Sequence, residues 1–87
     1  YTKALEINPN DDDIYYNLGN AKNSLEDYYG AISDYTKAIE IKPAADAYVH
    51  RAFSKRKIGD LKGACSDWRK ASSFGDESAA NWVRNQC

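Results

Sequence analysis

The chain has 87 residues, and its 12 basic and 13 acidic side chains leave a formal net charge of -1 at pH 7. A chain of this length forms one compact domain with a small core. The balanced charge argues against a nucleic-acid-binding protein, which needs a basic face, and the lack of a long apolar run argues against a membrane span.

Short apolar segments at helical spacing alternate with turn residues along the chain. The first, Tyr1 to Asn8, ends at Pro9 because proline cannot continue a helix. The acidic run Asp11 to Asp13 follows. We assign this run to helix capping rather than to a cation, since it lacks the turn glycine and downstream glutamate of a calcium loop. We therefore expect no metal at this run, and the sequence indicates no cofactor.

Two helix-turn-helix units are predicted next, at residues 12–44 and 45–75, with turns at Glu26-Asp27 and Gly59-Asp60. Gly75 is typical of a helix end, and Asp76 can cap a last helix over residues 76–87. Connections this short require neighbouring helices to be antiparallel. No segment alternates with period two, so the sequence predicts an all-α fold.

A duplication runs through these elements. The segment Tyr1 to Pro9 recurs almost letter for letter as Tyr35 to Pro43, 34 residues later. A second segment, Ala31 to Ala38, is matched by Ala64 to Ala71, 33 residues later. Self-similarity at this period predicts an array of helical repeats.

The residues between these copies extend the match. In the first unit the spaced positions are Tyr15, Leu18, Gly19, Ala31, Tyr35, Ala38 and Pro43, and in the second they are Tyr48, Ala52, Ala64, Trp68 and Ala71. This pattern resembles the tetratricopeptide repeat, a helical hairpin of about 34 residues. Lys22 and Lys55 depart from it, because they stand where the family has an aromatic residue, and we expect looser packing there or lysine stems that cover the aromatic rings.

The resemblance implies hairpins stacked as a right-handed superhelix, or α-solenoid. Residues 1–9 would be the second helix of a truncated repeat, and residues 76–87 a capping helix with Ala79, Trp82 and Val83 facing inward. Gly19 and Ala52 would lie where the two helices of a hairpin come closest.

The resemblance also implies a non-catalytic scaffold that binds a peptide segment in a concave groove formed by the first helices of the repeats. The candidate groove residues are Tyr16, Asn17, Asn20, Asn23, Val49, His50, Phe53 and Arg56. Asparagine amides both donate and accept hydrogen bonds, so they can hold a peptide backbone. The expected ligand is a peptide with a hydrophobic anchor and an acidic group near Arg56.

Two narrower functions find no support. A clamp for chaperone tails needs basic residues at positions that fall on Tyr16, or on Asp46 and His50, and none of these is lysine or arginine. His50 is the single histidine and lacks a catalytic partner at helical spacing, so we expect no enzyme activity.

The two cysteines leave two alternatives open. The last helix should return antiparallel and bring Cys87 toward Cys65, so a disulfide is one reading; a buried thiol and a free terminal thiol are the other. The sequence shows no secretory signal and favours the cytoplasm, but a bridged pair would indicate a secreted or periplasmic protein.

The chain begins at Tyr1 rather than Met, and we interpret it as the C-terminal end of a longer array. The unpartnered first helix would leave an apolar edge that includes Leu5 and Ile7. An alternative function is therefore a structural module that extends a solenoid or forms a homodimer through this edge. A third is a regulatory module attached to an enzyme outside these residues.

Overall fold

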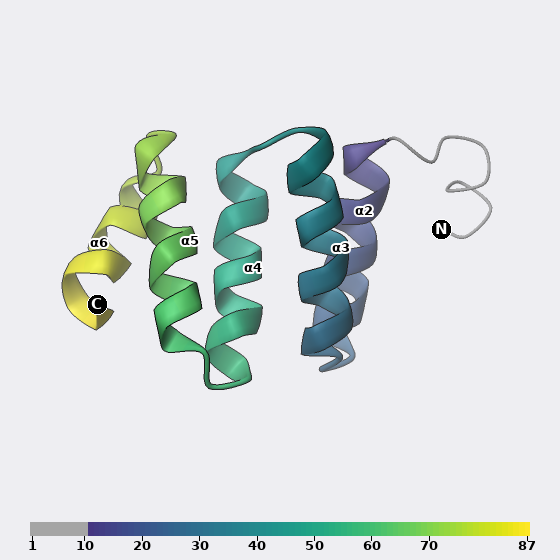
Figure 1. Cartoon of the computed structure of the whole chain (residues 1–87), viewed down its shortest axis with the longest axis horizontal. Coiled ribbons are helices and arrows are strands. Elements are labelled where there is room, and N and C mark those ends of the chain that lie inside the picture. The colour runs from purple at the N-terminus through teal and green to yellow at the C-terminus, as the bar shows by residue number, and fades with distance from the viewer. Residues whose placement is uncertain (1–10) are drawn as a thin grey trace.

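The computed structural model describes residues 11–87, in which five helices follow one another with short connections. They are α2 (Asp12–Ser24), α3 (Tyr28–Ile41), α4 (Ala45–Lys57), α5 (Leu61–Ser73) and α6 (Glu77–Gln86). Each helix packs against the next in sequence, and α4 also contacts α2. The helices form an elongated row with α6 at one end and the α2–α3 hairpin at the other (Figure 1).

The all-α fold predicted from the sequence is confirmed, because the described residues hold helices and no strand. The helix predicted over residues 1–9, and with it the predicted homodimer edge, lies outside the described residues. Among residues 11–87, no helix is both long and apolar enough to cross a membrane.

Aspartates begin four of the five described helices and satisfy their first amide groups. Asp11 accepts a hydrogen bond from the amide of Asp13 at 2.9 Å, so the capping function predicted for the acidic run is confirmed. In the two hairpin turns, Asp27 accepts from Gly30 at 3.1 Å and Asp60 accepts from Gly63 at 2.9 Å. Asp76 caps α6 by accepting from Ala79 at 2.9 Å. Caps of this kind set where each helix starts.

The two hairpin turns differ at one equivalent position. Gly59 has φ of 88° in the turn between α4 and α5, and Glu26 has φ of 63° at the matching place between α2 and α3. The left-handed region suits glycine but is costly for a residue with a Cβ atom. The first hairpin therefore carries backbone strain that the second avoids.

The hairpins are held together by small residues set against large ones. Gly19 of α2 is buried against Tyr35 of α3, and a Cβ atom at Gly19 would lie 2.6 Å from Cε1 of that ring. Gly19 thus leaves room for the ring of Tyr35 between the two helices of the first hairpin. Buried alanines fill the other narrow places; they are Ala31, Ala38, Ala47, Ala52, Ala64, Ala71 and Ala79.

The last helix covers the open side of α5. Ala79 is fully buried, and Trp82 and Val83 pack against the core of the second hairpin, so all three face inward as the sequence predicts. The ring centroids of Trp82 and the buried Trp68 lie 5.7 Å apart. At its far end α6 is joined to α5 by a disulfide between Cys65 and Cys87.

Replacing Glu26 with glycine is expected to stabilise the protein, because it removes the strain of a left-handed residue that bears a Cβ atom. Glycine's larger unfolded-state entropy offsets part of that gain, which leaves a net increase of about 0.5–1 kcal/mol in the unfolding free energy. For a domain of this size that corresponds to a rise in Tm of roughly 2–8 °C.

The matched control is Gly59→Glu, which introduces the same strain into the second turn and should lower Tm. Thermal unfolding followed by circular dichroism gives both values. A Glu26→Gly variant no more stable than the parent would contradict the assignment of strain to this turn.

Candidate functional site

A hollow of about 450 Å³ opens on one side of the helix row. Its lining residues, here called the aromatic hollow, are Asn23, Val49, His50, Phe53, Arg56, Trp68 and Trp82. They come from α2, α4, α5 and α6, and α4 supplies four of them. A concave, mostly apolar site with a few polar groups is the form that ligand sites usually take.

Five of the eight residues predicted for the groove line this hollow. Asn23 contributes from α2, while Val49, His50, Phe53 and Arg56 contribute from α4. Tyr16 lies next to the hollow in contact with His50, and Asn17 is exposed and does not line it.

The sequence reasoning missed the two tryptophans of the hollow. Trp68 and Trp82 were both predicted as packing residues, and each packs as predicted. Both residues also line the hollow, one from α5 and one from α6. Two tryptophans in a chain with a small core are the signal that could have pointed to this additional role.

A cluster of three rings stands beside the hollow at the junction of the two hairpins. Tyr16 meets His50 edge to face with centroids 5.4 Å apart, and Tyr35 lies 5.9 Å from each of them. His50 Nδ1 is 2.7 Å from the carbonyl oxygen of Asp46, which can only accept a hydrogen bond. Nδ1 therefore carries the proton, and Nε2 is the nitrogen through which a neutral ring can accept.

Burial keeps the two tyrosine hydroxyls of this cluster protonated. It is the main cause that raises the pKa of Tyr16; the charge of Asp46 adds to the rise, and a hydrogen bond with Asn20 opposes it. Burial also raises the pKa of Tyr35 well above its usual range, with further contributions from Tyr16 and Asp34. Both hydroxyls are thus neutral hydrogen-bonding groups at physiological pH.

Two of the predicted groove asparagines already have partners within the protein. The hydroxyl of Tyr35 donates to Oδ1 of Asn20 at 2.5 Å. The hydroxyl of the fully buried Ser54 donates to Oδ1 of Asn23 at 3.0 Å and so connects α4 to α2. These amide oxygens stabilise the hairpin junction, and the NH₂ group of Asn23 remains as a donor.

The helices that carry this geometry match a known family. The tetratricopeptide repeat model matches residues 13–44, which include almost all of α2 and the whole of α3. The chain contains a tetratricopeptide repeat. No curated protein matches the chain. Tetratricopeptide repeats generally mediate protein–protein interaction, and the family is generally a non-catalytic scaffold.

The second hairpin departs from this repeat at Arg51, which replaces the leucine found at Leu18 of the first hairpin. Its guanidinium donates to both carboxylate oxygens of Asp67, from Nε at 2.9 Å and from Nη2 at 2.7 Å. Nη1 donates to the hydroxyl of Thr36 on α3 at 3.1 Å. One arginine thus joins the second hairpin to the first.

Asp67 is the anionic centre of this junction. Its side chain is 4% exposed, and Lys55 places its ammonium 3.2 Å from Oδ2. The hydrogen bond with Asp67 is the main cause that raises the pKa of Arg51, while burial opposes the rise. Asp67 is buried, Arg51 is largely buried, and several hydrogen bonds satisfy the pair, the condition under which such an ion pair is tolerated.

The lysines that replace the family's aromatic residues have the same arrangement in both hairpins. Lys22 pairs with Asp34 at 2.9 Å, and Lys55 pairs with Asp67 at 3.2 Å. The sequence predicts loose packing or lysine stems over aromatic rings at these positions. The structure adds that each ammonium reaches an aspartate on the second helix of its own hairpin, 12 residues further along the chain.

Asp67→Asn is expected to destabilise the protein by about 3 kcal/mol, because it leaves the guanidinium of Arg51 buried without its counter-charge. The equivalent change Asp34→Asn is the matched control. Its partner Lys22 is 40% exposed, so the loss should stay below about 1 kcal/mol. Urea unfolding measures both, and equal losses would contradict the difference in burial.

Proposed function

We propose that this chain is a protein-interaction module that binds a segment of a partner protein in the aromatic hollow. The segment places one large apolar side chain, preferably aromatic, between Phe53, Trp68 and Trp82. An acidic group next to that side chain pairs with Arg56. The composition of the hollow carries the proposal: within the described residues its lining has one formally charged side chain, Arg56, and no carboxylate.

The apolar part of the hollow supports an aromatic anchor. Phe53 is 42% exposed although its helix neighbours Ala52 and Ser54 are fully buried. An exposed ring in a concave place can be covered by a ligand, and burial of an aromatic side chain is the largest single apolar contribution to an interface. Trp82, which is partly buried, and Trp68, which is 3% exposed, also line the hollow.

The charge at the end of α4 supports an acidic neighbour for the anchor. The last turn of α4 carries Lys55, Arg56 and Lys57. Lys55 is paired with Asp67, and the ammonium of Lys57 lies 5.3 Å from the centre of the Phe53 ring. Arg56 is exposed at the hollow, where it can bind a carboxylate through two parallel hydrogen bonds. Charge complementarity of this kind orients a ligand and accelerates its association.

Asn23 supports binding of the ligand's backbone. Its amide oxygen is occupied by Ser54, but its NH₂ group remains a donor at the hollow. The NH₂ group can therefore donate a hydrogen bond to the carbonyl oxygen of a peptide bond in the ligand. The three contributions describe a short segment with an apolar anchor, a neighbouring acid and one backbone contact.

Selection from a random peptide library displayed on phage tests the ligand chemistry. We expect enrichment of peptides in which Trp, Phe or Tyr lies within a few residues of Asp or Glu. Enrichment of basic peptides, or of none, would contradict the proposal. Light scattering over a concentration series should be run alongside, because association of the chain with itself would favour the alternative of a self-association module.

Variants of the hollow test its location. Phe53→Ala should weaken a selected peptide at least about tenfold, as expected for an interface anchor. Arg56→Gln should weaken acidic peptides and reduce the salt dependence of binding. Tyr29→Ala is the matched control, because Tyr29 is 72% exposed and lies outside the hollow. Equal affinities of the Phe53→Ala and Tyr29→Ala variants would place the site elsewhere.

A further inference from the structure

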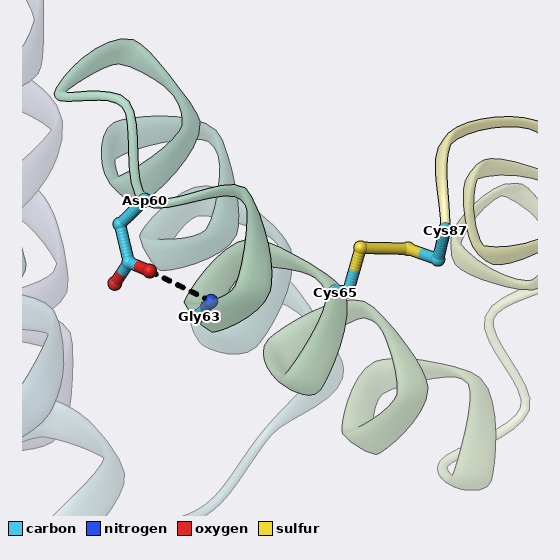
Figure 2. Close-up of a disulfide and its surroundings, with 4 residues drawn as sticks. All are labelled: Asp60, Gly63, Cys65 and Cys87. Atoms are coloured by element: carbon cyan, nitrogen blue, oxygen red, sulfur yellow. Dashed lines mark hydrogen bonds between the residues drawn. A yellow bond between two sulfur atoms is a disulfide. The ribbon is translucent and has the colours of Figure 1, made fainter.

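The disulfide between Cys65 and Cys87 holds the end of the last helix. Cys65 lies in the first half of α5, and Cys87 directly follows α6 (Figure 2). The Asp76 cap fixes the start of α6 and the disulfide fixes its end. Between them α6 buries Ala79 fully and Trp82 and Val83 in part.

The disulfide opens onto a second hollow on the outside of the molecule. This hollow, of about 390 Å³, is lined by Leu61, Lys62, Cys65, Arg69, Gln86 and Cys87, and here it is called the cationic hollow. Two of these described residues, Lys62 and Arg69, are basic and none is acidic. Cys87 is exposed, whereas Cys65 is 6% exposed.

We propose that the Cys65–Cys87 disulfide is a thiol-exchange site for a small anionic thiol, and that its redox state controls the order of α6. The cationic hollow is the entry to this site. Lys62 and Arg69 attract the negative charge of the incoming thiolate and stabilise the thiolate that leaves. Access from this side leads to Cys87, the exposed residue of the bonded pair.

The exchange proceeds in two balanced steps. The attacking thiolate forms a bond to Sγ of Cys87, the bond between the two cysteines breaks, and Sγ of Cys65 leaves with the electron pair and takes up a proton. A second thiol molecule then attacks the mixed disulfide, freeing the thiol of Cys87. The protein gains two thiols, and two small thiols are oxidised to one disulfide.

Besides this bond, α6 is held mainly by its packing against one neighbour, α5. It spans ten residues, shorter than an isolated helix needs to be stable in water. The bond closes a segment of 22 residues, so its reduction returns conformational entropy to that segment. Elements with few buried contacts are the first to open locally. Reduced α6 therefore separates from α5 far more readily than oxidised α6.

The opening of α6 would change the aromatic hollow. Trp82 lies five residues before Cys87 and forms one wall of that hollow, in contact with Trp68. Separation of α6 removes this wall and exposes Trp68 to water. This last step rests on the proposed function, but the exchange chemistry and the opening of α6 do not.

Three small thiols that differ in charge test the exchange site: mercaptoethanesulfonate, mercaptoethanol and cysteamine, which are anionic, neutral and cationic. Rates of reduction are compared at equal thiolate concentration and low ionic strength. We expect the anionic thiol to react about fivefold faster than the neutral one, the effect of one nearby charge in water, and the cationic thiol to be slowest. In the Lys62→Gln/Arg69→Gln double variant, the three thiols should reduce the disulfide at similar rates. Identical rates for the three thiols in the parent protein would contradict the proposed exchange site.

Tryptophan emission tests the control of α6. A Trp68→Phe variant reports Trp82 alone, and a Trp82→Phe variant reports Trp68 alone. Reduction should shift both emissions to longer wavelength and remove the protection of α6 amides from hydrogen exchange, while α2 to α4 keep theirs. Cys87→Ser should show the reduced behaviour without any thiol. Unchanged emission and protection after complete reduction would overturn the control.

These readouts use no peptide, so they stand or fall independently of the proposed function. Binding of a selected peptide to the oxidised and reduced protein is then compared. A weaker affinity after reduction supports the coupling, and an unchanged affinity together with an opened α6 overturns the coupling alone.

Discussion

The buried contact of Arg51 with Asp67 is the interaction on which the arrangement of the two hairpins depends. Arg51 binds the carboxylate of Asp67 on α5 and the hydroxyl of Thr36 on α3, so one side chain touches three helices. It also lies over the ring of Tyr48 with 5.5 Å between the guanidinium carbon and the ring centre. A leucine in this place, such as Leu18 in the first hairpin, can fill space but cannot connect two hairpins through directed bonds.

This junction also positions the candidate site. Arg51 and Lys55 lie on the same helix as His50, Phe53 and Arg56, and their ion pairs with Asp67 fix the rotation of α4. On the side toward α2, the bond between Ser54 and Asn23 holds α4 against the first hairpin. Polar contacts on two sides of α4 therefore fix the orientation of the helix. Its side chains Phe53 and Arg56 take no part in these contacts and remain exposed at the hollow.

The last helix, α6, contributes both to the core and to the candidate site. It buries the apolar side of α5, with Ala79 fully buried. It also contributes Trp82 to the aromatic hollow and is joined to α5 by the disulfide. The same short helix thus covers the core and lines the aromatic hollow. Any change that loosens α6 therefore also alters the hollow.

The sequence by itself determined the helices, their turns and their pairing. Aspartate caps, prolines and glycines act on neighbouring residues, and the size-selected positions Gly19, Tyr35 and Ala52 repeat at a family spacing, so these features can be read along the chain. Helical periodicity also separates the open face of α4 from its buried face, and four residues of the predicted groove on that helix line the aromatic hollow.

Only the tertiary structure decided which of those residues line the aromatic hollow together and which residues of other helices line it with them. Trp68 and Trp82 line the hollow because α5 packs against α4 and α6 packs against α5, and no local pattern encodes how these helices pack. The partners of Asn20, Asn23 and Lys22 were decided in the same way. Each is polar and lies on a helix surface, where a sequence pattern cannot distinguish a group that faces water from one that meets a neighbouring helix.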